Sequence, residues 1–349
     1  MFYLSKRDEL GSLPVNIRVS IIIPHYNGDI LLECLSSLFE HTTGSFEVIV
    51  VDDGSTDGSV DRAQAHFPAI RVLRNAHNRG LAVSCNRGFA AAQGHYLLLL
   101  NNDVEVQPGW LEELVRFADA HPRCAACQPK ILSAQDRSRF DYAGAAGGRI
   151  DEFGHTYCLG RLFDTLEEDR GQYDTPREIF WASGAALLLR RESLEQVGYL
   201  DELFFMHFEE IDLCWRLHLA GFQVWSVPSS TIYHHSGWTL PPESPRKMFL
   251  NHRNNLLLLL KNYALSSLLW AFPIRLGLEG LTILYALFRG DLKRAVAALK
   301  GMVWVAGHVR QIARRRATAQ AVRRVSDREI RRRMTRGSIA LRYFLGGSG

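Results

Sequence analysis

The chain has 349 residues, 47% of them hydrophobic, and a formal net charge of +4. This length exceeds the usual size of one domain and predicts a large domain with an appendage. The close pair Cys124 and Cys127 has neither the second pair of a zinc ribbon nor a thioredoxin-like flanking pattern, so we expect buried strand residues in a reducing cytosol. The first twenty residues are charged throughout and show no secretory signal.

Strands and helices alternate through the first hundred residues. Apolar, largely β-branched runs predict four strands, at residues 17–23, 46–51, 70–73 and 96–100. The first strand is expected to stop at Pro24, and helices are expected over 29–40 and 81–92. This order predicts an open, largely parallel α/β sheet wound with helices. No Gly-x-Gly-x-x-Gly motif follows the first strand, so a dehydrogenase-type dinucleotide fold is not expected.

An acidic loop, residues 52–57, follows the second predicted strand. Its charges would repel phosphates, but a carboxylate such as Asp53 can accept hydrogen bonds from a ring N–H and from ribose hydroxyls. The alternative is that the loop holds turn and N-cap residues, which explains Ser55 and Thr56 and could also explain Asp53.

The fourth predicted strand opens directly onto Asn101, Asn102 and Asp103. Ligands of open α/β sheets bind at the carboxyl ends of strands, so a carboxylate at Asp103 is placed for chemistry. Taken alone, an Asp at this point could equally open the next loop by hydrogen-bonding its own backbone.

The second half of the chain offers an acidic pair and a histidine pair. From Glu209 to Gly221 the apolar residues recur at helical spacing, so Glu209 and Glu210 lie in the first turn of a helix, where the helix dipole alone favours carboxylates. Asp212 and Arg216, four residues apart, are interpreted as an ion pair. A strand-like run over 222–227 then leads to His234 and His235, which could be metal ligands or structural residues. Residues 133–173 are expected to form a variable loop near an acceptor.

Several ordered motifs resemble those of the family 2 inverting glycosyltransferases, which have the GT-A fold. The matching motifs are Pro24-His25-Tyr26-Asn27, residues 51–57, Asn78-Arg79-Gly80 with Asn86 and Gly88, and Leu100-Asn101-Asn102-Asp103. Residues 198–216 resemble the acceptor half of bacterial rhamnosyltransferase-like members. The family's Asp-x-Asp metal motif reads Asn101-Asn102-Asp103 here, so only Asp103 carries over as a metal-binding carboxylate.

The resemblance implies a role for each of these residues. It implies a Mg²⁺ or Mn²⁺ ion held by Asp103, with His234 as a second ligand. It makes Glu210 the catalytic base, with Glu209 as the reserve candidate. The residues implied to bind the nucleotide-sugar donor are Pro24, Tyr26, Asn27, Asp53, Asn78, Asn86 and Asn102.

Beyond residue 248 the chain becomes apolar and basic. Apolar runs over 262–274 and 276–288 are interrupted by Pro273, Arg275 and Glu279, and neither reaches the roughly 18 residues of a spanning helix. Arginine clusters follow at residues 314–316, 323–324 and 331–333. Basic helices with apolar faces suit an anionic membrane surface, so a peripheral position on the inner face of the cell membrane is expected. A solvated or nucleic-acid-binding tail is the alternative, although no specific nucleic acid is expected.

These interpretations divide the chain into an N-terminal extension (1–18), a GT-A domain (19–238) with a nucleotide-sugar half (19–106) and an acceptor half (107–238), a linker (239–247) and an amphipathic, helical, basic C-terminal region (248–349). The expected activity is inverting, metal-dependent transfer of a sugar, with rhamnose suggested by resemblance. The donor would be a dTDP-, UDP- or GDP-linked sugar, and the acceptor a saccharide or polyprenyl-diphosphate-linked glycan of the cell envelope.

Two alternatives remain. A sugar nucleotidyltransferase shares a similar sheet but usually carries a glycine-rich loop with Arg and Lys after the first strand, which residues 24–28 do not match. A non-catalytic nucleotide-sugar or lipid-binding scaffold is favoured if Asn101, in place of the family's Asp, abolishes metal binding.

Overall fold

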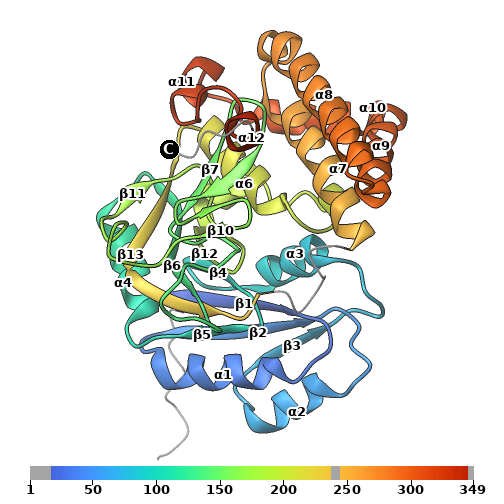
Figure 1. Ribbon diagram of the computed structural model, residues 1–349. Helices are drawn as coiled ribbons and strands as arrows, with labels where there is room; N and C mark the ends of the chain where they lie inside the picture. The colour runs from blue at the N-terminus through green and yellow to red at the C-terminus, as the bar shows by residue number, and fades with distance from the viewer. Residues whose placement is uncertain (1–16, 237–243, 345–349) are drawn as a thin grey trace, which may run out of the picture.

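The computed structural model describes residues 17–236 and 244–344, and its centre is a nine-stranded mixed sheet (Figure 1). In spatial order the strands are β11 (Arg177–Glu178), β13 (Gln223–His234), β6 (Cys124–Ser133), β12 (Ala186–Arg190), β4 (Tyr96–Leu100), β1 (Val19–His25), β2 (Phe46–Asp52) and β3 (Arg71–Arg74), with β5 (Val104–Val106) paired to β13. Strands β1 to β4 form the parallel part that the sequence predicts, while β12 pairs antiparallel with β4.

Strand β1 differs from the prediction at its end, because it continues through Pro24 to His25. Strand β4 pairs only with residues 19–22 of β1, so no ladder on that side needs the missing N–H of Pro24. The extension brings His25 to the same edge of the sheet as the loops that follow β2 and β4.

Helices cover both faces of the sheet. Those of the first 220 residues are α1 (Ile30–His41), α2 (Ser59–His66), α3 (Leu81–Ala91), α4 (Trp110–Ala120), α5 (Arg191–Val197), the short 3-10 turn η1 (Glu202–Phe204) and α6 (Glu209–Leu219). Because side chains alternate along a strand, Ile21 and Ile23 pack in the core beneath α1 and α4, while Ile22 packs in the core beneath α3 and α6.

The segment expected to be a variable loop is more ordered than predicted. It contains a second, four-stranded antiparallel sheet, formed by β7 (Gly148–Ile150), β8 (Thr156–Cys158), β9 (Arg161–Leu162) and β10 (Thr165–Leu166). Strands of two or three residues are too short to show alternation of apolar and polar residues, which explains why the sequence gave no signal for them.

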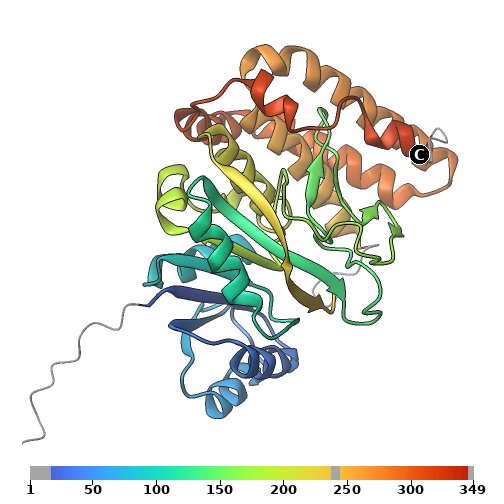
Figure 2. The same ribbon diagram turned by 90° about the vertical axis from the view of Figure 1, so that its left-hand side faces the viewer.

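The C-terminal helices gather at the end of the molecule opposite to α1 and α2 (Figures 1 and 2). They are α7 (Pro245–Asn262), α8 (Leu265–Phe288), α9 (Leu292–Gly307), α10 (Val309–Ala321), α11 (Asp327–Arg332) and α12 (Ile339–Phe344). Helix α7 begins inside the predicted linker, since Ser244 is its N-cap and Pro245 occupies its first turn. Residues 239–243 of that linker lie outside the described residues.

The expectation of two separate apolar runs, 262–274 and 276–288, was wrong, because one 24-residue helix, α8, runs through Pro273, Arg275 and Glu279. Leu269, whose carbonyl loses its helical partner to the proline, is exposed, so water can satisfy that carbonyl. Arg275 and Glu279 are buried and paired with each other across one turn. Within the described residues α8 is the one helix whose length and composition would allow it to cross a membrane, and 28% of its most apolar window is buried.

The arginine clusters are not a free basic tail. Arg316 donates to the carbonyl of Leu260 at 2.7 Å, and Arg323 donates to that of Asn262 at 2.5 Å, so both satisfy carbonyls at the end of α7. Arg333 donates to the carbonyl of Phe222 and lies 3.0 Å from Glu178. Some of these arginines therefore form contacts within the C-terminal helices, and Arg333 links these helices to the main sheet.

Candidate active site

A cleft of about 700 Å³ opens at the carboxyl ends of β1, β2 and β4, and its far wall is formed by the starts of α6 and α7. Most residues singled out from the sequence line it: Pro24, Tyr26, Asp53, Asn78, Asn102, Asp103, Glu209, Glu210 and His234. The fold thus brings together carboxylates that lie about a hundred residues apart in the chain.

Asn27 and Asn86 are not among the residues that line this cleft. The side-chain oxygen of Asn27 accepts from the backbone of Thr56, which joins the loops after β1 and β2. Asn86 binds both backbone groups of Leu200, at 2.9 and 3.0 Å, which joins α3 to the turn before α6. Both asparagines occupy motif positions of the resemblance, but their side-chain amides hydrogen-bond the backbone of neighbouring segments.

Asp53 organises the loop beside it. Its Oδ1 accepts from Asn75 Nδ2 at 2.7 Å and from the N–H of Arg79 at 2.9 Å, and its Oδ2 accepts from the N–H of Gly80 at 2.9 Å. Each carboxylate oxygen can accept two hydrogen bonds, so one position at Oδ2 remains for a ligand.

Replacing Asp53 by Ala is expected to lower the free energy of unfolding by about 2 to 4 kcal/mol, because two backbone N–H groups and one amide lose their acceptor. Urea unfolding followed by circular dichroism measures this loss. Asp61→Ala is the matched control, since Asp61 is 74% exposed and pairs only at the surface with Arg74; we expect a change within about 0.5 kcal/mol. Equal stability of the two variants would contradict the structural role.

His25 is a cleft residue that the sequence analysis did not single out beyond its motif. Its Nε2 lies 2.9 Å from Ser59 Oγ and its Nδ1 lies 2.8 Å from Asn102 Nδ2. Asn102 Nδ2 can only donate, so Nδ1 of His25 is the acceptor and Nε2 carries the proton. Burial lowers the pKa of His25, which keeps this imidazole neutral and holds Asn102 in place.

Asp103 and His234 meet at the edge of the cleft. His234 Nε2 lies 3.1 Å from Asp103 Oδ1, and its Nδ1 lies 2.8 Å from Asp141 Oδ1. Burial would lower the pKa of His234, but the two carboxylates outweigh burial and raise it to about 10. Burial would likewise raise the pKa of Asp103, but His234 reverses the effect and lowers it.

The residues fit a divalent metal ion as two of its ligands, provided that the ion displaces the proton that the two carboxylates hold on His234. Asp103 Oδ1 is buried and lacks a well-directed hydrogen-bond donor, and a second carboxylate, Asp141, orients the imidazole from behind, as at many metal sites. No group of three or more His, Cys, Asp or Glu side chains suited to a metal occurs in the described ranges. Any ion would therefore complete its shell with water and with phosphate oxygens, as Mg²⁺ commonly does.

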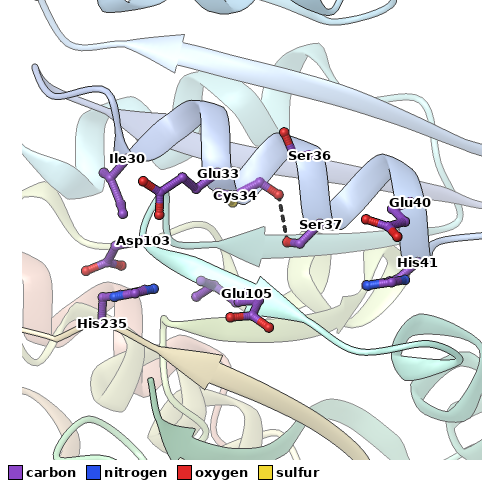
Figure 3. Close-up of a pocket in the computed structure, with 11 residues that line it drawn as sticks. Ile30, Glu33, Cys34, Ser36, Ser37, Glu40, His41, Asp103, Glu105 and His235 are labelled. Atoms are coloured by element: carbon purple, nitrogen blue, oxygen red, sulfur yellow. Dashed lines mark hydrogen bonds between the residues drawn. The ribbon is translucent and has the colours of Figure 1, made fainter. Parts of the chain in front are cut away.

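A second pocket, of about 370 Å³, lies on the other side of Asp103, between α1 and β5. Figure 3 shows Asp103 and His235 at one end of it and Glu40 and His41 at the other, with Glu105 between them. His235 thus faces away from the larger cleft, whereas His234 lines that cleft. The pocket contains neither Glu209 nor Glu210, so the candidate chemistry lies in the larger cleft.

Glu209 and Glu210 begin α6 as predicted, and both reach the cleft. Burial raises the pKa of Glu210 to about 7. Burial, together with the charge of Glu210, raises the pKa of Glu209 well above its usual range. Near neutral pH Glu210 can therefore lose its proton and act as a base.

The turn before this helix has a strained backbone. Phe205, His207 and Phe208 have φ angles of 65°, 67° and 74°, a conformation that costs residues with a Cβ about 1 to 3 kcal/mol each. Helix α7 holds the turn: Asn254 Nδ2 is within donating distance of the carbonyls of Phe204, Met206 and His207, at 3.1, 2.9 and 2.7 Å. The position of the acidic pair thus depends on a helix that follows it in the chain.

The predicted ion pair between Asp212 and Arg216 is present, with 2.9 Å between Oδ2 and Nε. Lys261 of α7 joins it at 2.7 Å from the same oxygen, which ties α6 to α7 in the buried interior.

The sequence model of the family described as "Glycosyl transferase family 2" matches residues 20–198, just over half of the chain. The chain is a family 2 glycosyltransferase. Among curated proteins, this glycosyltransferase is 27% identical over 292 residues to the N-acetylglucosaminyl-diphospho-decaprenol L-rhamnosyltransferase of Mycobacterium tuberculosis, covering 79% of this chain and 94% of that one.

Solved structures show the same fold as this glycosyltransferase. The mannosyltransferase PcManGT from Pyrobaculum calidifontis, in complex with GDP-Man and Mn²⁺, is 17% identical with a TM-score of 0.50 and covers 89% of each chain. GalNAc-T7 with UDP, GalNAc and Mn²⁺ is 17% identical with a TM-score of 0.53, covering 70% of this chain and 48% of that one. At this identity the likeness shows the fold, a mixed α/β GT-A architecture.

Proposed function

We propose that this glycosyltransferase moves a sugar from a nucleoside-diphosphate sugar to a hydroxyl of a saccharide or polyprenyl-diphosphate-linked glycan, with inversion, in cell-envelope polysaccharide synthesis. The observation that carries the proposal is that Asp103 with His234, and the acidic pair with Glu210, line one cleft. The name of the relative from Mycobacterium tuberculosis makes rhamnose the first sugar to test. Membership of family 2 favours this function over a nucleotidyltransferase or a non-catalytic scaffold.

The donor would lie at the ends of β1, β2 and β4. Tyr26 is 47% exposed and can pack on the nucleoside, with Pro24 and Asn78 beside it in the cleft. The free acceptor position at Asp53 Oδ2 suits a ribose hydroxyl or a base N–H. Asn102, held by His25, faces the same space.

The reaction follows from the charges that form during transfer. As the acceptor oxygen attacks the anomeric carbon, Glu210 accepts its proton, and the bond to the diphosphate breaks from the opposite face, so the configuration inverts. Asp103 and His234 would hold Mg²⁺ or Mn²⁺, which supplies positive charge for the departing diphosphate.

A panel of dTDP-, UDP- and GDP-sugars tests the function. We expect one of them to release its nucleoside diphosphate only when an acceptor and a divalent ion are present, and the product to have the inverted anomeric configuration by NMR. A sugar nucleotidyltransferase would instead consume added pyrophosphate and convert the nucleotide-sugar to a nucleoside triphosphate and a sugar 1-phosphate. If no donor and acceptor pair released a nucleoside diphosphate, the non-catalytic scaffold would be the remaining alternative.

We also propose that the enzyme binds the inner face of the cell membrane through the α8–α9 hairpin. Each helix has one exposed apolar stripe: Leu281, Leu284, Tyr285 and Phe288 on α8, and Leu292, Val296, Leu299 and Val303 on α9. The stripes meet at the hairpin turn, where Phe288 is 88% exposed, and Arg289, Lys293 and Arg294 are exposed around it. Apolar tips ringed by basic side chains bind anionic bilayers.

Vesicle flotation tests this surface. The wild-type protein is expected to float with phosphatidylglycerol vesicles, and the double variant Phe288→Glu/Leu292→Glu is expected to bind at least about tenfold more weakly, because two apolar side chains no longer enter the bilayer. Leu341→Glu, at a 40% exposed position on α12, is the matched control and should float like the wild type. Flotation of the double variant at the wild-type level would refute this surface.

A further inference from the structure

Two cations face the cleft without a carboxylate partner. Arg161, on β9, and Lys247, in the first turn of α7, both line the cleft and both lie against the ring of Tyr142. Arg161 Cζ is 4.0 Å and Lys247 Nζ is 5.9 Å from the ring centroid. Across residues 17–236 and 244–344, neither side chain forms an ion pair with an acidic group.

This arrangement is unfavourable without a ligand. Arg161 is only 9% exposed, and its Nε is buried without a hydrogen-bond partner among the described residues. Burial lowers the pKa of Lys247, and the nearby charge of Arg161 lowers it further. Buried charges are normally paired, so two neighbouring unpaired cations in a cleft indicate space for an anion.

The surroundings add to the positive potential. Lys247 belongs to the first turn of the 18-residue helix α7, whose N-terminus carries the positive end of the helix dipole. His207 is close enough that Lys247 contributes to lowering its pKa, after burial, to about 4, and its Nε2 is buried without a partner in the described chain. A neutral imidazole can still donate one hydrogen bond to an anion.

We propose that Arg161 and Lys247 form a binding site for a diphosphate group. The planar guanidinium of Arg161 suits two oxygens of one phosphate, and the ammonium of Lys247 suits a point contact with the next. The site deepens the proposed function and rests on it, because the nucleotide-sugar donor and a lipid-linked acceptor both carry a diphosphate. A cation–π contact with Tyr142 would explain the position of Arg161 alone. It would not explain why a second cation, Lys247, lies against the same ring.

Inorganic pyrophosphate is the direct probe, titrated calorimetrically into the full-length protein without metal. We expect the wild type to bind it, and Lys247→Gln and Arg161→Gln each to bind about tenfold more weakly, as removal of one charge-assisted hydrogen bond predicts. Arg246→Gln is the matched control, since it removes one positive charge from the adjacent residue, whose guanidinium lies over Phe205. Its affinity should equal that of the wild type.

Two further ligands identify the source of the diphosphate. Loss of affinity for UDP, GDP or dTDP in Lys247→Gln assigns the site to the donor, and loss for farnesyl diphosphate assigns it to a lipid-linked acceptor. Circular dichroism checks the fold of Arg161→Gln, and Lys247, which is partly exposed, carries the test if that variant unfolds. Wild-type protein that does not bind pyrophosphate, or Lys247→Gln that binds it equally well, overturns the proposal. If no donor in the turnover panel released its nucleoside diphosphate, the proposed function would be refuted, but the pyrophosphate-binding result would still stand.

Discussion

Glu210→Gln is expected to abolish sugar transfer while leaving donor binding intact. A carboxamide cannot accept the proton of the acceptor hydroxyl, and loss of a general base lowers turnover by about 10² to 10⁴-fold. The same change should stabilise the folded protein at high pH. Burial raises the pKa of Glu210 from 4.5 to about 7, so ionising it in the folded state costs about 3 kcal/mol.

The pH dependence has a definite sign. A carboxyl whose pKa is higher in the folded than in the unfolded state contributes stability below about pH 4.5, and this contribution is lost as the pH rises through 7. Wild-type turnover is therefore expected to rise through pH 7 while the melting temperature falls. In Glu210→Gln the fall in melting temperature over that range should become smaller.

Glu209→Gln is the matched control for the base. It removes the adjacent carboxyl from the same helical turn but keeps Glu210, so we expect measurable turnover. Nucleoside diphosphate release and thermal melting from pH 5 to 9 measure both effects. Full activity of Glu210→Gln together with an inactive Glu209→Gln would assign the base to Glu209.

Asp103→Ala is expected to abolish turnover by a different route, through loss of donor binding. Without its carboxylate the proposed metal keeps only His234 from the protein. Removing a residue that hydrogen-bonds a metal ligand already lowers metal affinity by about 10 to 100-fold. Removing a ligand itself should therefore lower metal affinity by at least about 100-fold. Calorimetric titration of UDP, GDP or dTDP with and without Mn²⁺ measures this difference.

The metal-dependent part of nucleotide affinity is the quantity to compare. In Asp103→Ala it should vanish, while the metal-free affinity stays near that of the wild type. Glu105→Gln is the control, because Glu105 lies two residues further on, lines the second pocket and pairs with Arg137. A variant at Asp103 that kept full Mn²⁺-dependent binding would remove this residue from the metal site.

The parts of the site that could be predicted are those encoded by local sequence pattern. A run of five buried residues ending at Leu100 locates Asp103, and helical spacing after Glu209 locates the acidic pair. Periodicity and strand ends depend on neighbouring residues, so they can be interpreted without tertiary information.

The missing parts depend on contacts between distant segments. Arg161 and Lys247 reach the cleft from a glycine-rich segment and from a late helix, and Asp141 contacts His234 from behind the cleft. No local pattern marks these three residues. Asn27 and Asn86 show the converse problem, because a motif position does not reveal whether an amide binds a ligand or the backbone of a neighbouring segment. Arginines such as Arg316 look solvated in the sequence because the carbonyls that they satisfy lie more than fifty residues earlier.

The support that Asn254 gives to the turn before α6 sets a limit on how this enzyme can be shortened. The range matched by the family ends at residue 198, before the acidic pair, His234 and all of α7. A fragment cut there would contain the proposed donor-binding residues but neither Glu210, the proposed base, nor His234. Even a fragment extended to residue 236 would leave three carbonyls of a strained turn without their amide donor. The minimal working unit therefore extends at least through α7.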